Sequence, residues 1–158
     1  METPSKATKI FSRPLASLAA AFLAGCATPA IHPGEKVYLT GAQEVPPVST
    51  PATGTGYIRV RDDGSVSGSI TTSGITSTAG HIHMGATGKN GPVTVPLTKT
   101  SDNTYAVPAG AALTDAQLSG YQAGNLYVNI HSAAHPGGEI RAQISPVPGR
   151  PPGGYAMD

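Results

Sequence analysis

The sequence predicts an all-β fold, a single antiparallel β-sandwich of about eight short strands with one short helix. Glycine and proline are frequent, at 20 and 15 of the 158 residues, whereas Trp is absent and Phe occurs twice. This composition is typical of many turns between short strands. Several short segments alternate apolar and polar side chains, and turn residues recur about every ten positions, which favours a Greek-key sandwich.

Each expected strand combines apolar alternation with a turn at its boundary. The expected strands cover residues 36–40, 55–61, 65–72, 80–84, 93–99, 104–107, 126–132 and 139–145. After the first of them, residues 41–54 hold three prolines. Because proline cannot donate a ladder hydrogen bond, we expect a loop or a sheet edge there. The clearest hairpin comes next, where Asp62, Asp63 and Gly64 supply a turn between two alternating segments.

The second half of the chain continues this pattern with one interruption. The segment GATGKNGP separates the fourth and fifth strands, and Ser101, Asp102 and Asn103 form the turn before the sixth. A helix of about two turns is then predicted, because Thr114 and Gln117 have the spacing of a capping box. Gly120 or Gly124 can end it. The last two strands flank AAHPGG and form a hairpin or a sandwich connection.

The chain begins with a predicted lipoprotein signal peptide over residues 1–25. Lys6, Lys9 and Arg13 precede an apolar run much shorter than the roughly 20 residues that span a bilayer. Leu23-Ala24-Gly25-Cys26 matches a lipobox, so we expect the leader to be removed and Cys26 to be lipidated. Cys26 is the only cysteine, and the alternative is an ordinary signal peptide.

Three further segments follow Cys26 in the predicted organisation. They are a lipidated tether at 26–35, the β-sandwich domain at 36–145 and a disordered Pro/Gly-rich tail at 146–158. Ala27, by resemblance to enteric lipoproteins, favours the outer membrane, facing the periplasm or the cell surface. We therefore expect an exported protein attached to a membrane through its lipid.

Charge and motif content exclude several functions. Charged residues make up 12% of the chain and the formal net charge is +1, so no basic surface for nucleic acid is expected. The sequence has no G-x-S-x-G motif and no cysteine left for nucleophilic chemistry, which disfavours a hydrolase. An enzymatic function is not predicted.

Four of the five histidines fall into two groups, AGHIHMG and NIHSAAHPG. His81 and His83 are two positions apart in the sequence, so both imidazoles project from one face of a strand. His131 lies on the polar face of a later strand, in which Leu126, Val128 and Ile130 form the apolar face. If the two strands are neighbours, these three histidines can bind copper or zinc. The alternative is a set of solvated strand histidines without metal.

Other residues near the histidines have weaker assignments. His135 and the thioether of Met84 are alternative fourth ligands, although Met84 is better explained as a packing residue. Glu139 and Arg141 share a strand face and could orient a ligating imidazole, or they could form a surface ion pair. Glu44 is expected to organise its loop by accepting backbone hydrogen bonds.

Three segments in order, LTGAQEVPPVSTPATGTG, AGHIHMGATGKNGPV and LYVNIHSAAHPGGEIRAQI, resemble the chordin-type (CHRD) domain of bacterial exported proteins. The resemblance covers residues 36–145. It implies an extracytoplasmic β-domain, but a family name does not by itself confer a mechanism.

A second likeness concerns the copper half of copper-zinc superoxide dismutase, which the G-H-I-H segment, the later His131 and Arg141 resemble. It implies a superoxide-dismutase-like sandwich with a three-histidine copper site and a nearby arginine. The zinc-site residues and the cysteine pair of that enzyme have no counterpart here, so dismutase activity is not expected.

Two functions therefore stay open at this point. One is a lipid-anchored, non-catalytic domain that binds an extracytoplasmic protein or another surface component. The other is a copper-binding or redox lipoprotein that uses the three histidines. Retention of copper by the purified protein would distinguish them.

Overall fold

The structure, a computed structural model, describes Met1 and residues 34–146. The predicted signal peptide, Cys26 and most of the tether lie outside the described residues, as does the tail from residue 147 onward. Within the described part of the chain, no helix has both the length and the apolar character needed to cross a membrane.

The all-β prediction is confirmed, with one short helix and nine strands. In chain order the elements are β1 (Glu35–Thr40), the 3-10 helix η1 (Gly41–Gln43), β2 (Thr53–Val60), β3 (Val66–Ser73), β4 (Ser77–Met84), β5 (Val93–Pro96), β6 (Thr98–Ser101), β7 (Thr104–Ala106), α1 (Asp115–Gln122), β8 (Leu126–Ser132) and β9 (Ile140–Ile144). The predicted strand at 93–99 is two strands, because the chain changes partner at Leu97.

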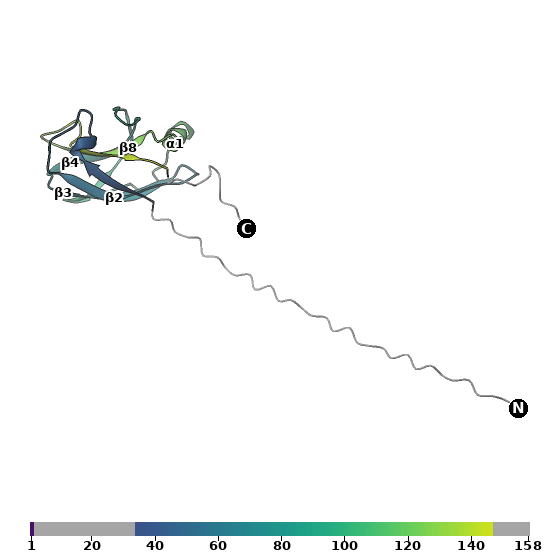
Figure 1. The fold of residues 1–158 in the computed structure, drawn as a ribbon. Coiled ribbons are helices and arrows are strands. Elements are labelled where there is room, and N and C mark those ends of the chain that lie inside the picture. The colour runs from purple at the N-terminus through teal and green to yellow at the C-terminus, as the bar shows by residue number, and fades with distance from the viewer. Residues whose placement is uncertain (2–33, 147–158) are drawn as a thin grey trace. The chain divides into compact units, whose positions relative to one another are not determined.

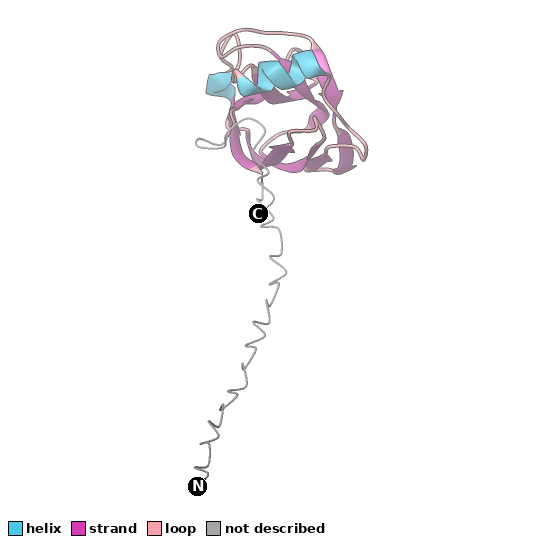
Figure 2. Ribbon diagram, turned by 90° about the vertical axis from the view of Figure 1, so that its right-hand side faces the viewer, coloured by secondary structure: helices cyan, strands magenta, loops and turns pink. Residues whose placement is uncertain are grey.

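All nine strands belong to one antiparallel sheet in the order β5-β4-β8-β9-β1-β2-β3-β7-β6. Its two end strands, β5 and β6, are consecutive in the chain and separated only by Leu97, whose N–H donates to the carbonyl of Gly80 at 2.9 Å. The sheet therefore curls until it is nearly closed, and its halves face each other as in a sandwich (Figure 2). The neighbours β4–β8 and β3–β7 require long connections of the Greek-key kind.

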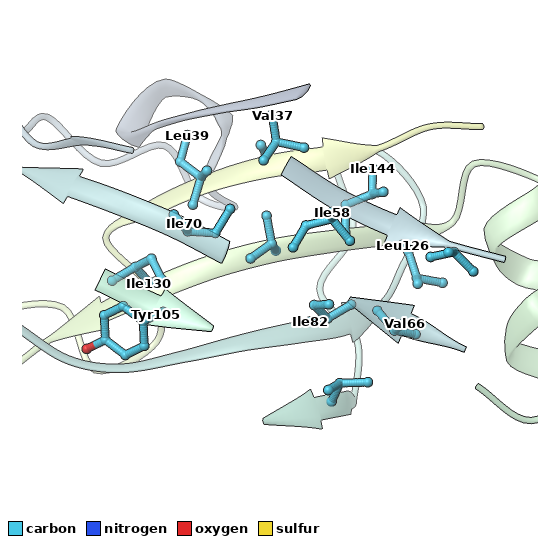
Figure 3. Packing of buried hydrophobic residues seen from close by; sticks show 14 of the residues in the cluster. Val37, Leu39, Ile58, Val66, Ile70, Ile82, Tyr105, Leu126, Ile130 and Ile144 are labelled. Atoms are coloured by element: carbon cyan, nitrogen blue, oxygen red, sulfur yellow. The ribbon is translucent and has the colours of Figure 1, made fainter. Parts of the chain in front are cut away.

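One apolar core fills the inside of the curled sheet (Figure 3). Side chains alternate between the two faces of a strand, so every second residue points inward. Leu126, Val128 and Ile130 of β8 are all fully buried, and so is Ile82 of β4. The apolar face seen in the sequence is therefore the inner face of the sheet, and the histidines lie on the other face.

The helix and the first hairpin form as predicted. Thr114 and Gln117 make both bonds of the capping box, at 2.9 and 3.3 Å. The chain leaves the helix through Gly124, whose φ of 75° favours glycine. In the β2–β3 turn, Gly64 has a φ of 80° and the carboxylate of Asp63 accepts from the Ser65 N–H at 2.9 Å.

Strand β8 differs from an ordinary sandwich strand because all seven of its residues are buried. Two loops, residues 41–52 and 85–92, account for this burial on the outer side. Asn90 of the second loop donates to the carbonyl of Val45 in the first at 2.7 Å, and the Gly91 N–H donates to the hydroxyl of Tyr127 on β8 at 3.2 Å. The polar outer face of β8 is thereby enclosed, together with His83 of β4 and Arg141 of β9.

Candidate metal centre

Neighbouring strands bring the three predicted histidines together. β4 and β8 pair antiparallel, with His81 opposite Asn129, His83 opposite Tyr127 and Ala79 opposite His131. The two strands lie next to each other in the sheet (Figure 1). Because alternate residues of a strand share a face, His81, His83 and His131 all project from the outer face.

The imidazole nitrogens converge. One ring nitrogen from each histidine lies within 4.8 Å of the other two. His81 Nδ1 and His131 Nε2 are 2.9 Å apart. His83 and His131 are buried and His81 is half-buried, so His81 forms the solvent side of the cluster.

Backbone carbonyls select the tautomers of two rings. His83 Nδ1 lies 2.9 Å from the carbonyl of Gly91, and His131 Nδ1 lies 3.0 Å from the carbonyl of Pro136. A carbonyl only accepts, so both Nδ1 atoms carry the proton and both Nε2 atoms keep a lone pair. His83 Nε2 is buried and makes no hydrogen bond of good geometry among the described residues, although the Asn129 side chain lies close enough to oppose the lowering of its pKa. This is the arrangement in which a metal-binding histidine is oriented by its other ring nitrogen.

The surroundings favour neutral imidazoles. Burial lowers the pKa of His81, and the nearby charges of His131 and His83 lower it further. Burial also lowers the pKa values of His83 and His131, against the opposing effect of the Gly91 and Pro136 carbonyls. A neutral imidazole is the form that binds a metal ion.

The spacing suits a single ion. Two nitrogens bound to one ion at about 2.0 Å with a right angle between the bonds lie about 2.8 Å apart. The separation of 2.9 Å between His81 Nδ1 and His131 Nε2 matches adjacent ligands of this kind. The cluster as a whole spans up to 4.8 Å, whereas two nitrogens bound to one ion at about 2.0 Å are at most about 4 Å apart, so a small inward shift of a ring completes a site formed by His81 Nδ1, His83 Nε2 and His131 Nε2.

The two alternative fourth ligands are placed differently. His135 is half-buried and does not belong to the nitrogen cluster, and its charge acts on Glu139. Met84 follows His83 and therefore lies on the inner face of β4, where it packs against the core. A Cβ added to Gly120 of α1 would come within 2.5 Å of its sulfur. Met84 is thus a packing residue and not a ligand.

Glu139 and Arg141 hold the covering loops. Glu139 accepts a hydrogen bond from the Thr50 hydroxyl at 2.7 Å. Although burial opposes ionisation, hydrogen bonds from Ser132 and Thr50 lower the pKa of Glu139. Arg141 is 1% exposed, and no ion pair joins it to Glu139 within residues 34–146. The predicted surface ion pair does not form, because each side chain is turned to a different loop.

Arg141 binds the 85–92 loop directly. Its guanidinium donates to the carbonyls of Lys89 and Ala86 at 3.0 and 3.4 Å, and to the side chains of Asn90 and Gln143, both at 3.2 Å. The same loop contains Gly91, whose carbonyl binds His83. Arg141 therefore supports the position of His83 through this loop.

The sequence reasoning did not assign Tyr127 and Asn129, although the alternation of β8 places both on the histidine face. Tyr127 is 2% exposed and stacks on His83, with 4.8 Å between ring centroids and 7° between planes. Asn129 is also 2% exposed, between His81 on β4 and Arg141 on β9. Their burial depends on the two covering loops, which no short-range pattern predicts.

Glu44 reaches this enclosed face from its loop. Its side chain is 5% exposed and its Oε1 has no hydrogen-bond partner in the described part of the chain. Burial raises the pKa of Glu44 to about 7, although the charge of Arg141 and hydrogen bonds from Val45 and Asn129 act in the opposite direction. The expected backbone bond within the loop is present at Val45, and the carboxyl is in addition part of the buried polar layer.

Comparison with known proteins agrees with the resemblance noted in the sequence. No curated protein and no solved structure matches the chain. The family model of the CHRD domain matches residues 36–144, which is the curled sheet from the second residue of β1 to the end of β9. The chain therefore belongs to the CHRD domain family.

Proposed function

We propose that this protein binds one copper ion at the cell envelope through His81 Nδ1, His83 Nε2 and His131 Nε2. The observation that carries the proposal is the convergence of three ring nitrogens, within 4.8 Å of one another, from two strands that are distant in the sequence. The carbonyls of Gly91 and Pro136 support it, because they keep the protons of His83 and His131 on Nδ1 and leave both Nε2 atoms unprotonated.

Copper is proposed because the cluster contains only imidazole ligands. Among divalent first-row ions, nitrogen sites bind Cu²⁺ most tightly, and imidazole also suits zinc. No carboxylate joins the three histidines in the cluster found among the described residues, so the hard ions Mg²⁺ and Ca²⁺ are disfavoured. The function we propose is binding, without a catalytic step.

Metal content tests this proposal. The whole chain, purified in detergent, is incubated with equimolar copper and zinc, dialysed, and analysed by mass spectrometry of its metals. We expect one equivalent of copper in the wild type, its loss in His83→Ala, and its retention in His135→Ala, because His135 lies outside the cluster. Absence of copper from the wild type, or equal loss in both variants, would contradict the proposal.

Attachment to the outer membrane is the second part of the proposal, and it is supported by the lipobox that ends at Cys26. If Cys26 is lipidated, mass spectrometry of the amino-terminal peptide will show a diacylglyceryl group on this residue. Cys26→Ser should remove the lipid and leave the protein uncleaved. An unmodified Cys26 in the purified wild type would rule out the anchor.

A non-catalytic role in binding a surface component is favoured by a separate observation. Tyr38 on β1 and Tyr57 on β2 are 57% and 42% exposed, and the ammonium of Lys36 lies 4.8 Å from the ring of Tyr38. Exposed tyrosines are common at protein interfaces. Binding to isolated envelopes of a chain that begins at residue 27, and therefore has no lipid, should fall in the Tyr38→Ser/Tyr57→Ser double variant and persist in His83→Ala. Binding that both variants retain would exclude this surface.

A further inference from the structure

A stack of three side chains extends from the candidate metal site into the interior of the polar layer. His83 on β4 stacks on Tyr127 of β8 with a centroid distance of 4.8 Å. The guanidinium carbon of Arg141, on β9, lies 3.4 Å from the centroid of the same tyrosine ring. Two groups this close to one ring occupy opposite faces of it. Strand order agrees, because β8 lies between β4 and β9.

The charge of Arg141 is poorly compensated. The four acceptors of its hydrogen bonds are the carbonyls of Ala86 and Lys89 and the side-chain oxygens of Asn90 and Gln143, all neutral. Arg141 is 1% exposed, so little water screens it. Within residues 34–146, Glu44 is the carboxylate whose charge acts on Arg141. Because burial raises the pKa of Glu44 to about 7, this carboxyl group is mostly neutral below pH 7 and then does not compensate the charge of Arg141.

We propose that Arg141 shifts the preference of the histidine site from copper(II) toward copper(I), acting through the Tyr127 and His83 rings. This inference rests on the proposed function, since it concerns the ion held at the same three histidines. A fixed positive charge behind a ligand repels a dication more than a monocation. It therefore lowers the affinity for copper(II) more than for copper(I) and raises the reduction potential of the bound ion.

The expected size follows from Coulomb's law. A unit charge about 10 Å from the bound copper ion, at an effective dielectric constant near 20, changes the affinity of the site for the ion by roughly tenfold for each unit of charge on the ion. Arg141→Gln should therefore raise the copper(II) affinity relative to copper(I) by about tenfold. Arg141→Lys keeps the charge and should stay close to the wild-type ratio.

Asn90 offers a milder test that leaves the arginine in place. Its Oδ1 accepts from Arg141 Nη1 at 3.2 Å, and its side chain is exposed. Asn90→Asp places a carboxylate against the guanidinium, although it also removes the hydrogen bond from the Asn90 amide to the Val45 carbonyl, and should raise the copper(II) to copper(I) affinity ratio a few-fold. Lys89→Gln is the matched control, because it changes the net charge equally in the same loop while its exposed side chain makes no hydrogen bond to Arg141.

The experiment uses the whole chain in detergent at pH 6.5. Copper(I) affinity is measured by competition with a chromogenic chelator, copper(II) affinity by competition with an amino acid chelator, and the reduction potential by voltammetry. The inference predicts that the ratio of copper(II) affinity to copper(I) affinity shifts most in Arg141→Gln, less in Asn90→Asp and least in Lys89→Gln. The reduction potential of the bound copper should fall in the first two variants. Circular dichroism checks the fold, and if Arg141→Gln is unfolded, Asn90→Asp decides.

The outcomes separate this inference from the proposed function. A wild-type chain that binds copper in neither oxidation state overturns both. A wild-type chain that binds copper, with an unchanged ratio and potential in Asn90→Asp and Arg141→Gln, overturns the role of Arg141 and leaves the histidine site intact. A shift in Lys89→Gln as large as that in Asn90→Asp also overturns it, because the contact with the guanidinium would then not matter.

Discussion

Burial controls the protonation of single residues at the histidine site. His81, His83 and His131 have pKa values below their ordinary value of 6.5, in each case mainly because burial disfavours the charged ring. The unfolded chain therefore takes up protons at a higher pH than the folded chain does. The stability that these histidines contribute is present above pH 6.5 and is lost as the pH falls through their lowered pKa values.

The same shift predicts the pH dependence of copper binding. Protons and copper compete for the same lone pairs, so depressed pKa values extend binding to more acidic solution. We expect the copper affinity of the whole chain to be nearly constant from pH 8 to about 6.5 and to fall below that value. A chelator competition at each pH measures it. A fall that already begins near pH 7, as for rings with an ordinary pKa of 6.5, would show that the rings are not buried in this way.

Glu44 has the opposite dependence, since its pKa is raised from 4.5 to about 7 by burial. Its protonated form favours the folded state, so this contribution is complete below pH 4.5 and is lost as the pH rises through 7. We predict that Glu44→Gln, which is neutral at every pH, is more stable than the wild type by about 2 kcal/mol at pH 8. At pH 4.5 the two should be equal in urea unfolding.

A surface carboxylate provides the control for Glu44. Asp102→Asn in the β6–β7 turn removes an exposed charge, and should change the free energy of unfolding by no more than about 0.5 kcal/mol at either pH. If Glu44→Gln behaved in the same way, the carboxyl would not be desolvated in the folded protein.

Among the structural elements, the 85–92 loop connects the fold to the site. Its Gly91 carbonyl holds the Nδ1 proton of His83, and its position depends on close contact with β4. A Cβ added at Gly91 would lie 1.6 Å from the carbonyl oxygen of Met84, which leaves no room for any side chain. The loop can therefore support His83 only with glycine at this position.

We predict that Gly91→Ala lowers copper affinity at least tenfold, because the displaced carbonyl no longer orients the His83 ring. Gly137→Ala is a suitable control, since an added Cβ there meets nothing within 4 Å and Gly137 does not have a positive φ. Isothermal titration with copper compares them. Equal affinities would mean that the loop does not position the ligand.

At the scale of the whole molecule, the site exists only when the sheet is closed. His131 is 50 residues from His81, and the two meet through the pairing of β4 with β8. Copper that binds this native arrangement raises the free energy of unfolding by mass action. The increase is about 2.7 kcal/mol at a free copper concentration one hundred times Kd.

We therefore predict that saturating copper raises the melting temperature of the whole chain by about 10 °C. His83→Ala should show almost no rise, while His135→Ala should match the wild type. Calorimetry with and without copper makes the comparison. A similar rise in His83→Ala would indicate a different binding site.

Local patterns in the sequence predict much of this structure. The alternation in LYVNIHS predicted β8 with its observed bounds, Leu126–Ser132, and the capping box predicted the start of α1. The H-x-H spacing placed His81 and His83 on one face, as the period of two in a strand requires. These features depend on residues that are close together in the chain, so they can be predicted from one sequence.

Only the tertiary structure decided how these parts meet. The register of β4 and β8 brought His131 to the other two histidines, while two covering loops buried the outer face and turned Arg141 to Tyr127 and the 85–92 loop. The change of strand partner at Leu97 has the same origin. Contacts between distant segments depend on packing over the whole sheet, and no local propensity of the residues involved specifies them.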